Sequence, residues 1–241
     1  MAVSRRVSVI IICSFSLVIY SMFVNNLDAS NVVSRIEVLF GVPYDTARYF
    51  GRFLASALLL GVAPVLTLLV LRIPIREIGL AIPKKFSSPI WWAAFLCLGV
   101  LIGLMGSFDP NLRLFYPFHP RLSEISLESR GIVFAGHSMA YFFLYYLGWE
   151  ITFRGVFVVC ITEPFVKRFD QIDKRLLVFA ILQAVPSAII HFGHPETEIV
   201  GALLFGFAAG YFSLVTRSIL PGLIVHAIAG ISLDLLLVVF A

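Results

Sequence analysis

Glu150, Arg154, His191 and His226 are among the ionisable side chains that lie in or beside long apolar stretches of the sequence. An ionisable group inside a bilayer is costly, so such residues are rare and usually serve a function. Glu150 and Arg154 are four residues apart and therefore share one face of a helix. They can form a buried ion pair that fixes two helices, or Glu150 can be a general base whose geometry Arg154 holds.

The two histidines differ in their expected place on a helix. Gly193 and Pro195 predict a helix end, which puts His191 in the last helical turn and His194 in the loop. His226 lies well inside a later apolar helix. Each imidazole is either a structural group whose hydrogen bonds are made within the protein or part of a reactive site.

Two carboxylates are candidates for supporting roles. Asp234 follows His226 by eight residues, on roughly the same helical face, and could orient its imidazole. Glu198 is expected in the first turn of its helix, where the helix dipole favours a negative charge. We therefore expect Glu198 to cap that helix.

These residue types allow two forms of hydrolysis. A carboxylate and a histidine can activate water as general bases. Neutral imidazoles with a carboxylate also suit zinc, and Glu150, His191 and His226 would then be the ligands, with His194 or Glu198 as further candidates. We expect no resident metal or cofactor, with zinc as the alternative.

Composition sets the environment of these groups. The chain is 60% hydrophobic and 13% charged, with a mean hydropathy of +0.97, whereas soluble domains have about 45–50% apolar and about 25% charged residues. The lipid bilayer is therefore the expected solvent. The net charge of +4 fits the excess of Lys and Arg in cytoplasmic loops of membrane proteins, and no basic cluster predicts a nucleic-acid partner.

Hydrophobic segments predict an all-α fold, a polytopic transmembrane bundle of seven or eight segments, because a span needs about 20 apolar residues. The fourth segment is long enough to be one tilted helix or a helix that breaks near Gly148 or Gly155. Gly206 and Gly210 form a GxxxG pattern, which allows close helix packing and a possible homodimer. The seven segments are Val7–Val24, Phe50–Leu71, Pro89–Met105, Gly131–Cys160, Leu176–Ile190, Ile199–Val215 and Ile219–Phe240.

Basic loops predict the orientation. Arg5 and Arg6 precede the first segment, which is too long for a typical signal peptide and is expected to remain as a span. We expect a cytoplasmic N-terminus in a bacterial cytoplasmic membrane. The other basic residues expected inside are Arg72, Arg76, Lys84, Lys85, Lys167, Arg168, Lys174 and Arg175.

Three short motifs occur in order on separate segments: Glu150-x-x-x-Arg154-Gly155, Ser187-x-x-x-His191 and His226-x-x-x-Gly230. This order resembles the CAAX protease and bacteriocin-processing family, which includes the type II CAAX prenyl endopeptidases. The resemblance covers about Gly131 to the C-terminus, so we divide the chain into N-terminal transmembrane helices (1–130) and a CAAX protease-like intramembrane domain (131–241).

The resemblance implies an intramembrane endopeptidase that acts on a membrane-associated peptide or protein, lipidated or not. Glu150 and His191 would activate a water molecule, and His226 would stabilise the oxyanion. Arg154, Glu198 and Asp234 would support them.

Two positions depart from the family pattern. Trp149 stands where the family usually has a first glutamate, and Gly230 stands where it usually has Asn or Asp. Asp234, Ser187 and Ser232 are candidates to replace the missing donor. The alternative function is therefore that of a non-catalytic family member, a membrane binding or regulatory protein.

Overall fold

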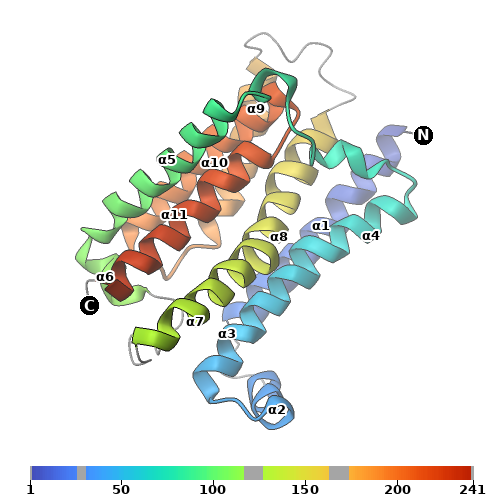
Figure 1. Ribbon diagram of the computed structural model, residues 1–241. Helices are drawn as coiled ribbons and strands as arrows, with labels where there is room; N and C mark the ends of the chain where they lie inside the picture. The colour runs from blue at the N-terminus through green and yellow to red at the C-terminus, as the bar shows by residue number, and fades with distance from the viewer. Residues whose placement is uncertain (1, 26–30, 117–126, 163–173, 240–241) are drawn as a thin grey trace.

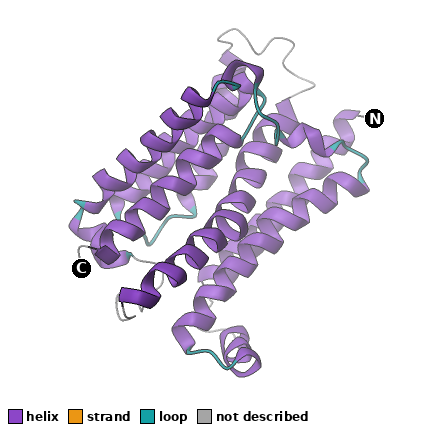
Figure 2. Cartoon of the chain, in the orientation of Figure 1, coloured by secondary structure: helices purple, strands orange, loops and turns teal. Residues whose placement is uncertain are grey.

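The protein is a bundle of long helices, as predicted (Figures 1 and 2). The computed structural model describes residues 2–25, 31–116, 127–162 and 174–239, and these ranges contain no β-strand. The α-helices are α1 (Ala2–Asn25), α2 (Asn31–Phe40), α3 (Tyr44–Ala55), α4 (Ala63–Val70), α5 (Pro89–Ser107), α6 (Pro110–Phe115), α7 (Leu127–Ala140), α8 (Leu147–Glu150), α9 (Lys174–Ile189), α10 (Glu196–Thr216) and α11 (Leu220–Val239). Short π-helices are η1 (Ser56–Val62), η5 (Tyr141–Tyr146) and η6 (Ile151–Cys160), and 3₁₀-helices are η2 (Ile75–Ile78) and η3 (Lys84–Phe86).

The described helices have the length and composition of a multi-pass membrane protein. Six of them are apolar and long enough to cross a bilayer, and α9 contributes a shorter apolar stretch, Leu177–Ile189. Large apolar side chains such as Phe15, Met105 and Leu204 are exposed on the outside of the bundle, as lipid-facing residues are. The total of seven or eight segments stays a prediction.

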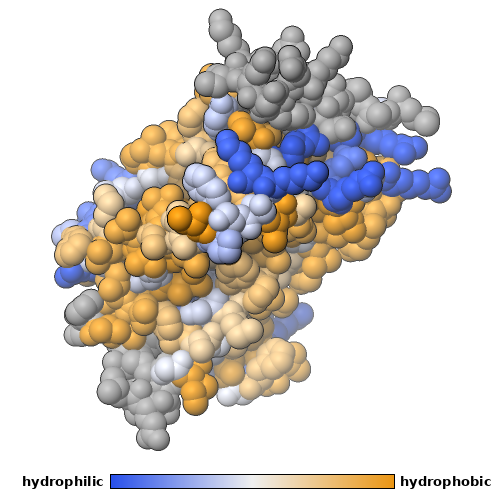
Figure 3. All heavy atoms as spheres, turned by 45° about the horizontal axis from the view of Figure 1, so that its top comes forward, coloured by the Kyte–Doolittle hydropathy of each residue, from blue (hydrophilic) through white to orange (hydrophobic). Residues whose placement is uncertain are grey.

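The largest group of hydrophilic residues lies at the upper right of Figure 3, which brings forward the top of Figure 1, and smaller hydrophilic patches lie elsewhere on that face. The exposed residues Arg72, Arg76, Lys84 and Lys85 belong to the connection between α4 and α5. Lys167 and Arg168 lie outside the described residues. The cytoplasmic orientation of this end therefore remains a prediction.

The fourth predicted segment is one continuous helix through the middle of the bundle (Figure 1), and it does not break at Gly148 or Gly155. Within its most apolar window, 72% of residues are buried, against 17–44% in the other five candidate spans. Its hydrogen-bonding pattern changes from α-helical to π-helical at two places, because the π-helical stretches η5 and η6 flank α8. Such π-helical turns are often found at functional sites.

Close contacts between η1 and α8 fix the position of the central helix along the bundle. A Cβ atom on Gly148 would lie 2.9 Å from the carbonyl oxygen of Ser56, so only glycine fits there. The hydroxyl of Ser56 donates to the carbonyl of Tyr145 at 3.1 Å, and that of Thr152 donates to the carbonyl of Leu60 at 2.6 Å. Hydroxyl bonds of this kind join helices across a membrane interior.

A connection at the N-terminal end holds the far end of the same helix. Arg6 forms an ion pair with Glu77 at 2.8 Å and donates to the carbonyl of Cys160. The carbonyl of Ile78 lies 3.1 Å from the place of a Cβ atom on Gly155. The Arg6 contacts therefore tie α1 and η2 to the last residue of η6.

Helix α11 is held by α5 through a second glycine pair, which the sequence analysis did not single out. A Cβ atom on Gly99 would lie 2.7 Å from Cβ of Ile228, and one on Gly103 would lie 2.6 Å from the carbonyl oxygen of Ala229. Gly99 and Gly103 form a GxxxG pattern, and it lets the two backbones approach closely. This contact sets the position of the helix that carries His226.

The GxxxG pattern of α10 is used within the molecule. A Cβ atom on Gly206 would lie 3.3 Å from Cα of Ala184, and one on Gly210 would lie 3.5 Å from Cα of Ala180. Both partners belong to α9, so this glycine face packs against α9. A homodimer formed through the same helix stays a prediction.

Substituting Gly103 by alanine is expected to destabilise the fold. The added methyl group would overlap the carbonyl of Ala229, and overpacking of this kind costs about 1–3 kcal/mol. Gly201→Ala is the matched control, because its Cβ would meet no atom within 4 Å. In thermal unfolding of the detergent-solubilised protein, Gly103→Ala should lower the midpoint and Gly201→Ala should not. Equal midpoints for both variants would mean that the α5–α11 contact is loose.

Candidate active site

Glu150, the carboxylate of the first motif, is fully enclosed in the bundle. It ends α8, and its side chain has no exposed surface. Its Oε1 accepts a hydrogen bond from Nδ1 of His226 at 2.7 Å and lies 3.3 Å from Nη1 of Arg154. The structure therefore joins the first and third predicted motifs directly.

Arg154 provides the expected charge partner of Glu150 from one turn further along the same helix. Its guanidinium is buried and lies 5.5 Å from the centre of the Phe205 ring, within cation–π range. Oε2 of Glu150 is also buried and accepts no hydrogen bond from the described residues. The carboxylate is therefore paired through one oxygen only.

His226 projects from α11 into an aromatic surrounding. Its ring lies 4.6 Å from that of Tyr146 and 4.8 Å from that of Phe205, measured between centroids. Its side chain is 22% exposed, whereas that of Glu150 is fully enclosed. Because Glu150 takes up Nδ1, Nε2 is the nitrogen left for a substrate.

The space beside Gly230 is filled by Tyr146. A Cβ atom on Gly230 would overlap the hydroxyl of Tyr146, so this tyrosine requires glycine at position 230. Tyr146 stands one turn before Glu150, and Gly230 stands one turn after His226. A phenol therefore occupies the place where the resembled family carries Asn or Asp.

The prediction that Asp234 orients His226 is wrong. Asp234 is fully buried and binds Nε2 of His137 at 3.0 Å, and Tyr49 bonds to the other nitrogen of that imidazole. Although Asp234 and His226 share a face of α11, eight residues at a rise of about 1.5 Å place them about 12 Å apart along the helix. Asp234 therefore links α3, α7 and α11 rather than the predicted site. The contact between His137 and Asp234 is thus a hydrogen bond between helices α7 and α11.

His191 lies in a turn just after α9, which ends at Ile189, and not in the last helical turn as predicted. Its Nδ1–H donates to the carbonyl of Ser187 at 2.7 Å, which leaves a lone pair on Nε2. The indole of Trp149 packs edge-on against the imidazole at 5.4 Å between centroids. Glu150 and His191 are not within 4 Å of each other, so the structure does not pair them as expected.

Glu198 does not cap α10, because no side chain caps the helix at Pro195. Its Oε1 instead accepts hydrogen bonds from the Tyr116 hydroxyl and from Nδ1 of His194, both at 2.9 Å. The same oxygen lies 3.8 Å from Nε2 of His191. The carboxylate expected to cap a helix is thus grouped with the second motif.

Burial lowers the pKa of His191 from its usual 6.5 to about 4. Glu198 and the bond to Ser187 partly offset this effect, and the positive charges of His194 and His226 add to it. His191 is therefore a neutral imidazole at neutral pH.

A small cavity of about 40 Å³ adjoins this group. It is lined by Trp149, His191 and His194 together with Arg52 and Tyr145, among others. A single water needs about 10–15 Å³ and two or more polar partners. The cavity therefore has room for water beside the histidine of the second motif.

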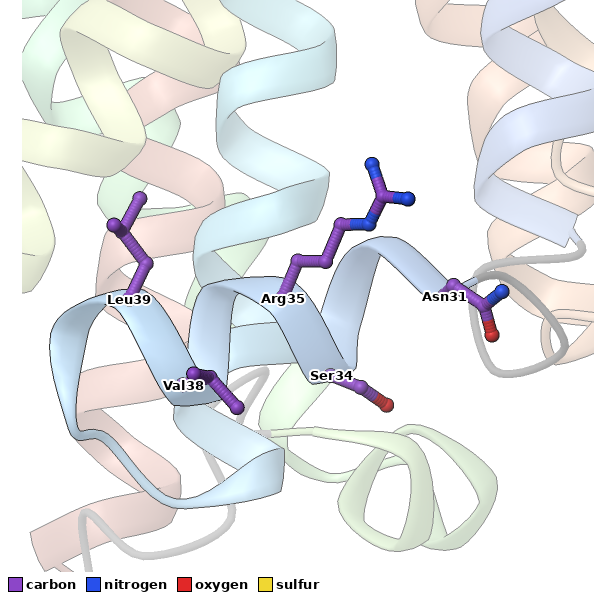
Figure 4. A pocket seen from close by; sticks show the side chains of 5 residues that line it. All are labelled: Asn31, Ser34, Arg35, Val38 and Leu39. Atoms are coloured by element: carbon purple, nitrogen blue, oxygen red, sulfur yellow. The ribbon is translucent and has the colours of Figure 1, made fainter.

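A larger, open hollow lies elsewhere, beside α2 (Figure 4). Arg35 is its only ionisable lining residue, and none of the predicted site residues borders it. The lining residues are Asn31, Ser34, Arg35, Val38 and Leu39. Of the predicted catalytic residues, His191 borders the small cavity and none borders the larger hollow.

Within the described ranges, no three His, Cys, Asp or Glu side chains are arranged to bind one metal ion. Glu150 and His226 are paired, but His191 faces Glu198 instead. The zinc ligand set considered from the sequence, Glu150, His191 and His226, is therefore not assembled here.

Two aromatic residues near the site were missed by sequence reasoning. Tyr146 and Tyr116 are common apolar-segment residues, and nothing in their spacing marks them. The only available signal for Tyr146 was Gly230, because a missing side chain in a motif implies that another group fills the space. No signal in the sequence pointed to Tyr116.

Comparison with known proteins gives one match. Residues 131–232 match the family model described as "Type II CAAX prenyl endopeptidase Rce1-like". The matched region contains Glu150, His191, Glu198 and His226. No curated protein and no solved structure matches the chain. Residues 131–232 are therefore similar to the Rce1-like type II CAAX prenyl endopeptidases, in agreement with the resemblance drawn from the three motifs.

Proposed function

We propose that the protein is an intramembrane endopeptidase that hydrolyses a peptide bond of a membrane-associated, lipidated substrate. The observation that carries the proposal is the 2.7 Å hydrogen bond between Glu150 and His226, which unites two motifs from separate helices inside the bundle. His191, in the turn after α9, contacts Trp149, the residue next to Glu150, with 5.4 Å between the ring centroids. A prenylated peptide fits both the family description and the apolar surface of the bundle.

His191 is the base in the proposed reaction. Its Nδ1–H is held by Ser187, so the Nε2 lone pair can take a proton from water while the oxygen attacks the peptide carbonyl. When the tetrahedral intermediate collapses, the same proton passes to the leaving amine. One water is consumed, and one carboxylate and one amine are released.

His226 is the proposed donor to the oxyanion. With Nδ1–H held by the Glu150 carboxylate, a protonated His226 presents Nε2–H to the negative oxygen. Glu150 then orients the ring and stabilises its charge, a role that a buried carboxylate commonly has beside a catalytic histidine. Arg154 places a positive charge 3.3 Å from the same carboxylate oxygen.

The hydroxyl of Tyr146 is the proposed second donor. It occupies the room of a side chain at position 230, and its ring packs on His226. A phenol O–H can donate to an oxyanion as an amide N–H does. The glycine at position 230 is on this account a consequence of the tyrosine.

The complete burial of Glu150 and the tryptophan at position 149 also fit the alternative, a non-catalytic membrane protein that binds peptides. A prenylated peptide would bind to the purified protein under either function. Only cleavage of the bound peptide distinguishes the endopeptidase from the non-catalytic alternative.

The proposal is tested with an internally quenched peptide that carries a farnesylated cysteine followed by three residues. Purified protein in liposomes should cleave this peptide, and His191→Gln should lower kcat/KM by about 10²–10⁴-fold, the range of general base catalysis. The unprenylated peptide measures the need for the lipid. Glu196→Gln serves as the control, because Glu196 is exposed. Binding without cleavage by the wild-type protein would favour the non-catalytic alternative.

Removing the hydroxyl of Tyr146 is expected to slow cleavage. Tyr146→Phe should lower kcat by about 10²-fold with little change in KM, because an oxyanion donor acts in the transition state. Tyr211→Phe removes a hydroxyl from a residue that packs on another apolar cluster and should leave kcat unchanged. An unaltered kcat in Tyr146→Phe would remove this residue from the reaction.

The acid side of the pH profile should reflect the burial of His191. Burial lowers the pKa of this imidazole to about 4, so the neutral form persists well below pH 6.5. The acid limb of kcat/KM should therefore have its midpoint near pH 4, and activity should fall as the pH drops through that value. A midpoint near 6.5 would instead indicate a solvated histidine. Unfolding midpoints measured at each pH separate this effect from loss of structure.

A further inference from the structure

The geometry around His191 contains two acceptors that face each other without a donor between them. Nε2 carries a lone pair, because Nδ1–H is committed to Ser187 at 2.7 Å. Oε1 of Glu198 is a carboxylate oxygen, and it lies 3.8 Å from Nε2. A direct N–H···O hydrogen bond spans about 2.7–3.2 Å, so this pair is too far apart and has no proton to share.

A water molecule satisfies both acceptors at this separation. Two hydrogen bonds of about 2.8 Å from one water join acceptors that are roughly 4 Å apart. His191 and His194, the two imidazoles that flank Glu198, also line the cavity of about 40 Å³, so there is room for water on the side of His191 that borders this cavity.

The carboxylate of Glu198 accepts hydrogen bonds from neighbouring side chains and is not a solvent-exposed surface group. Tyr116 and His194 both donate to its Oε1, and two donors of this kind stabilise a negative carboxylate. Burial and the neighbouring Glu198 raise the pKa of Tyr116, so this phenol keeps its proton and remains a donor. Oε2 of Glu198 is buried and accepts no hydrogen bond from the described residues.

Trp149 explains why a second carboxylate is needed. The indole covers one side of His191, at the position where the resembled family has a glutamate. The neighbouring Glu150 is fully enclosed and bonded to His226, so it does not supply the missing carboxylate.

We propose that Glu198 and His191 hold the attacking water between them, with Glu198 supplying the carboxylate that is absent at position 149. This inference rests on the proposed endopeptidase function and names the water-binding pair of the same site. The water donates one hydrogen to Nε2 of His191 and one to Oε1 of Glu198. On attack, His191 takes the proton, the oxygen bonds to the peptide carbonyl carbon, and the proton later leaves with the amine.

The first test compares Glu198→Gln with Glu196→Gln on the farnesylated quenched peptide. Both changes are isosteric and lie two residues apart in the first turn of α10. Glu198→Gln should lower kcat/KM by about 10²-fold or more, and Glu196→Gln should leave it within about twofold of wild type. An equal activity of both variants would overturn the proposal.

The second test moves the carboxylate back to the first motif. Trp149→Glu in the Glu198→Gln background should recover at least tenfold in kcat/KM, because it again places a carboxylate beside His191. Glu198→Gln with Trp149→Gln carries the same loss of the indole and should not recover. Recovery in both double variants would show that space, and not the carboxylate, limits the reaction, and would count against the proposal.

The third test needs no activity and so separates this inference from the proposed function. A structure at a resolution that shows waters should reveal density within hydrogen-bond distance of both Nε2 of His191 and Oε1 of Glu198, and this density should be lost in Glu198→Leu. A wild-type protein that holds this water and cleaves no peptide would refute the proposed function alone. No density at this place in a well-ordered wild-type site would refute the water-binding pair, whatever the activity.

Discussion

The burial of one carboxylate, Glu150, constrains most of the structure around it. An ion in an apolar interior costs several kcal/mol after relaxation, unless partners offset that cost. Arg154 and His226 are these partners, and both must reach the same oxygen of Glu150. The central helix and α11 must therefore lie close together in one register, and Gly230 of α11 makes that possible, because a Cβ atom there would overlap the hydroxyl of Tyr146 on the central helix.

The polar residues therefore form two groups, one around His226 and one around His191. Glu150 belongs to the first group, and Trp149 borders the second. Glu150 faces His226, whereas the indole of Trp149 faces His191. Neighbouring residues on a helix point about 100° apart, so one residue cannot serve both histidines. A chain with a single glutamate at this point can support only one histidine from α8. The other histidine must find its carboxylate on a different helix, and Glu198 on α10 is the one within reach.

Residue types could predict the helices and the short set of ionisable groups, since apolar length and the cost of charge in lipid are local properties. The pairings could not be predicted in the same way. Thirteen residues separate His137 from Glu150, which on a regular α-helix points them to different faces, yet His137 reaches the face of α11 that carries His226 and Asp234. The π-helical stretch η5 lies between them and changes the number of residues per turn. Glu198 was placed correctly at a helix start, but its partners Tyr116 and His194 come from loops, which sequence periodicity does not position.

The antiparallel course of the central helix and α11 gives the departure at Gly230 a physical meaning. Glu150 meets His226, Tyr146 meets Gly230 and His137 meets Asp234, in matching order along the two helices. In each contact, the side chain on one helix occupies the space that the facing residue on the other helix leaves open. An Asn at position 230 and a Tyr at position 146 would claim the same volume, so one excludes the other. The loss of the amide is therefore no sign by itself of a lost function, because the group that excludes it is also a hydrogen-bond donor beside the same histidine.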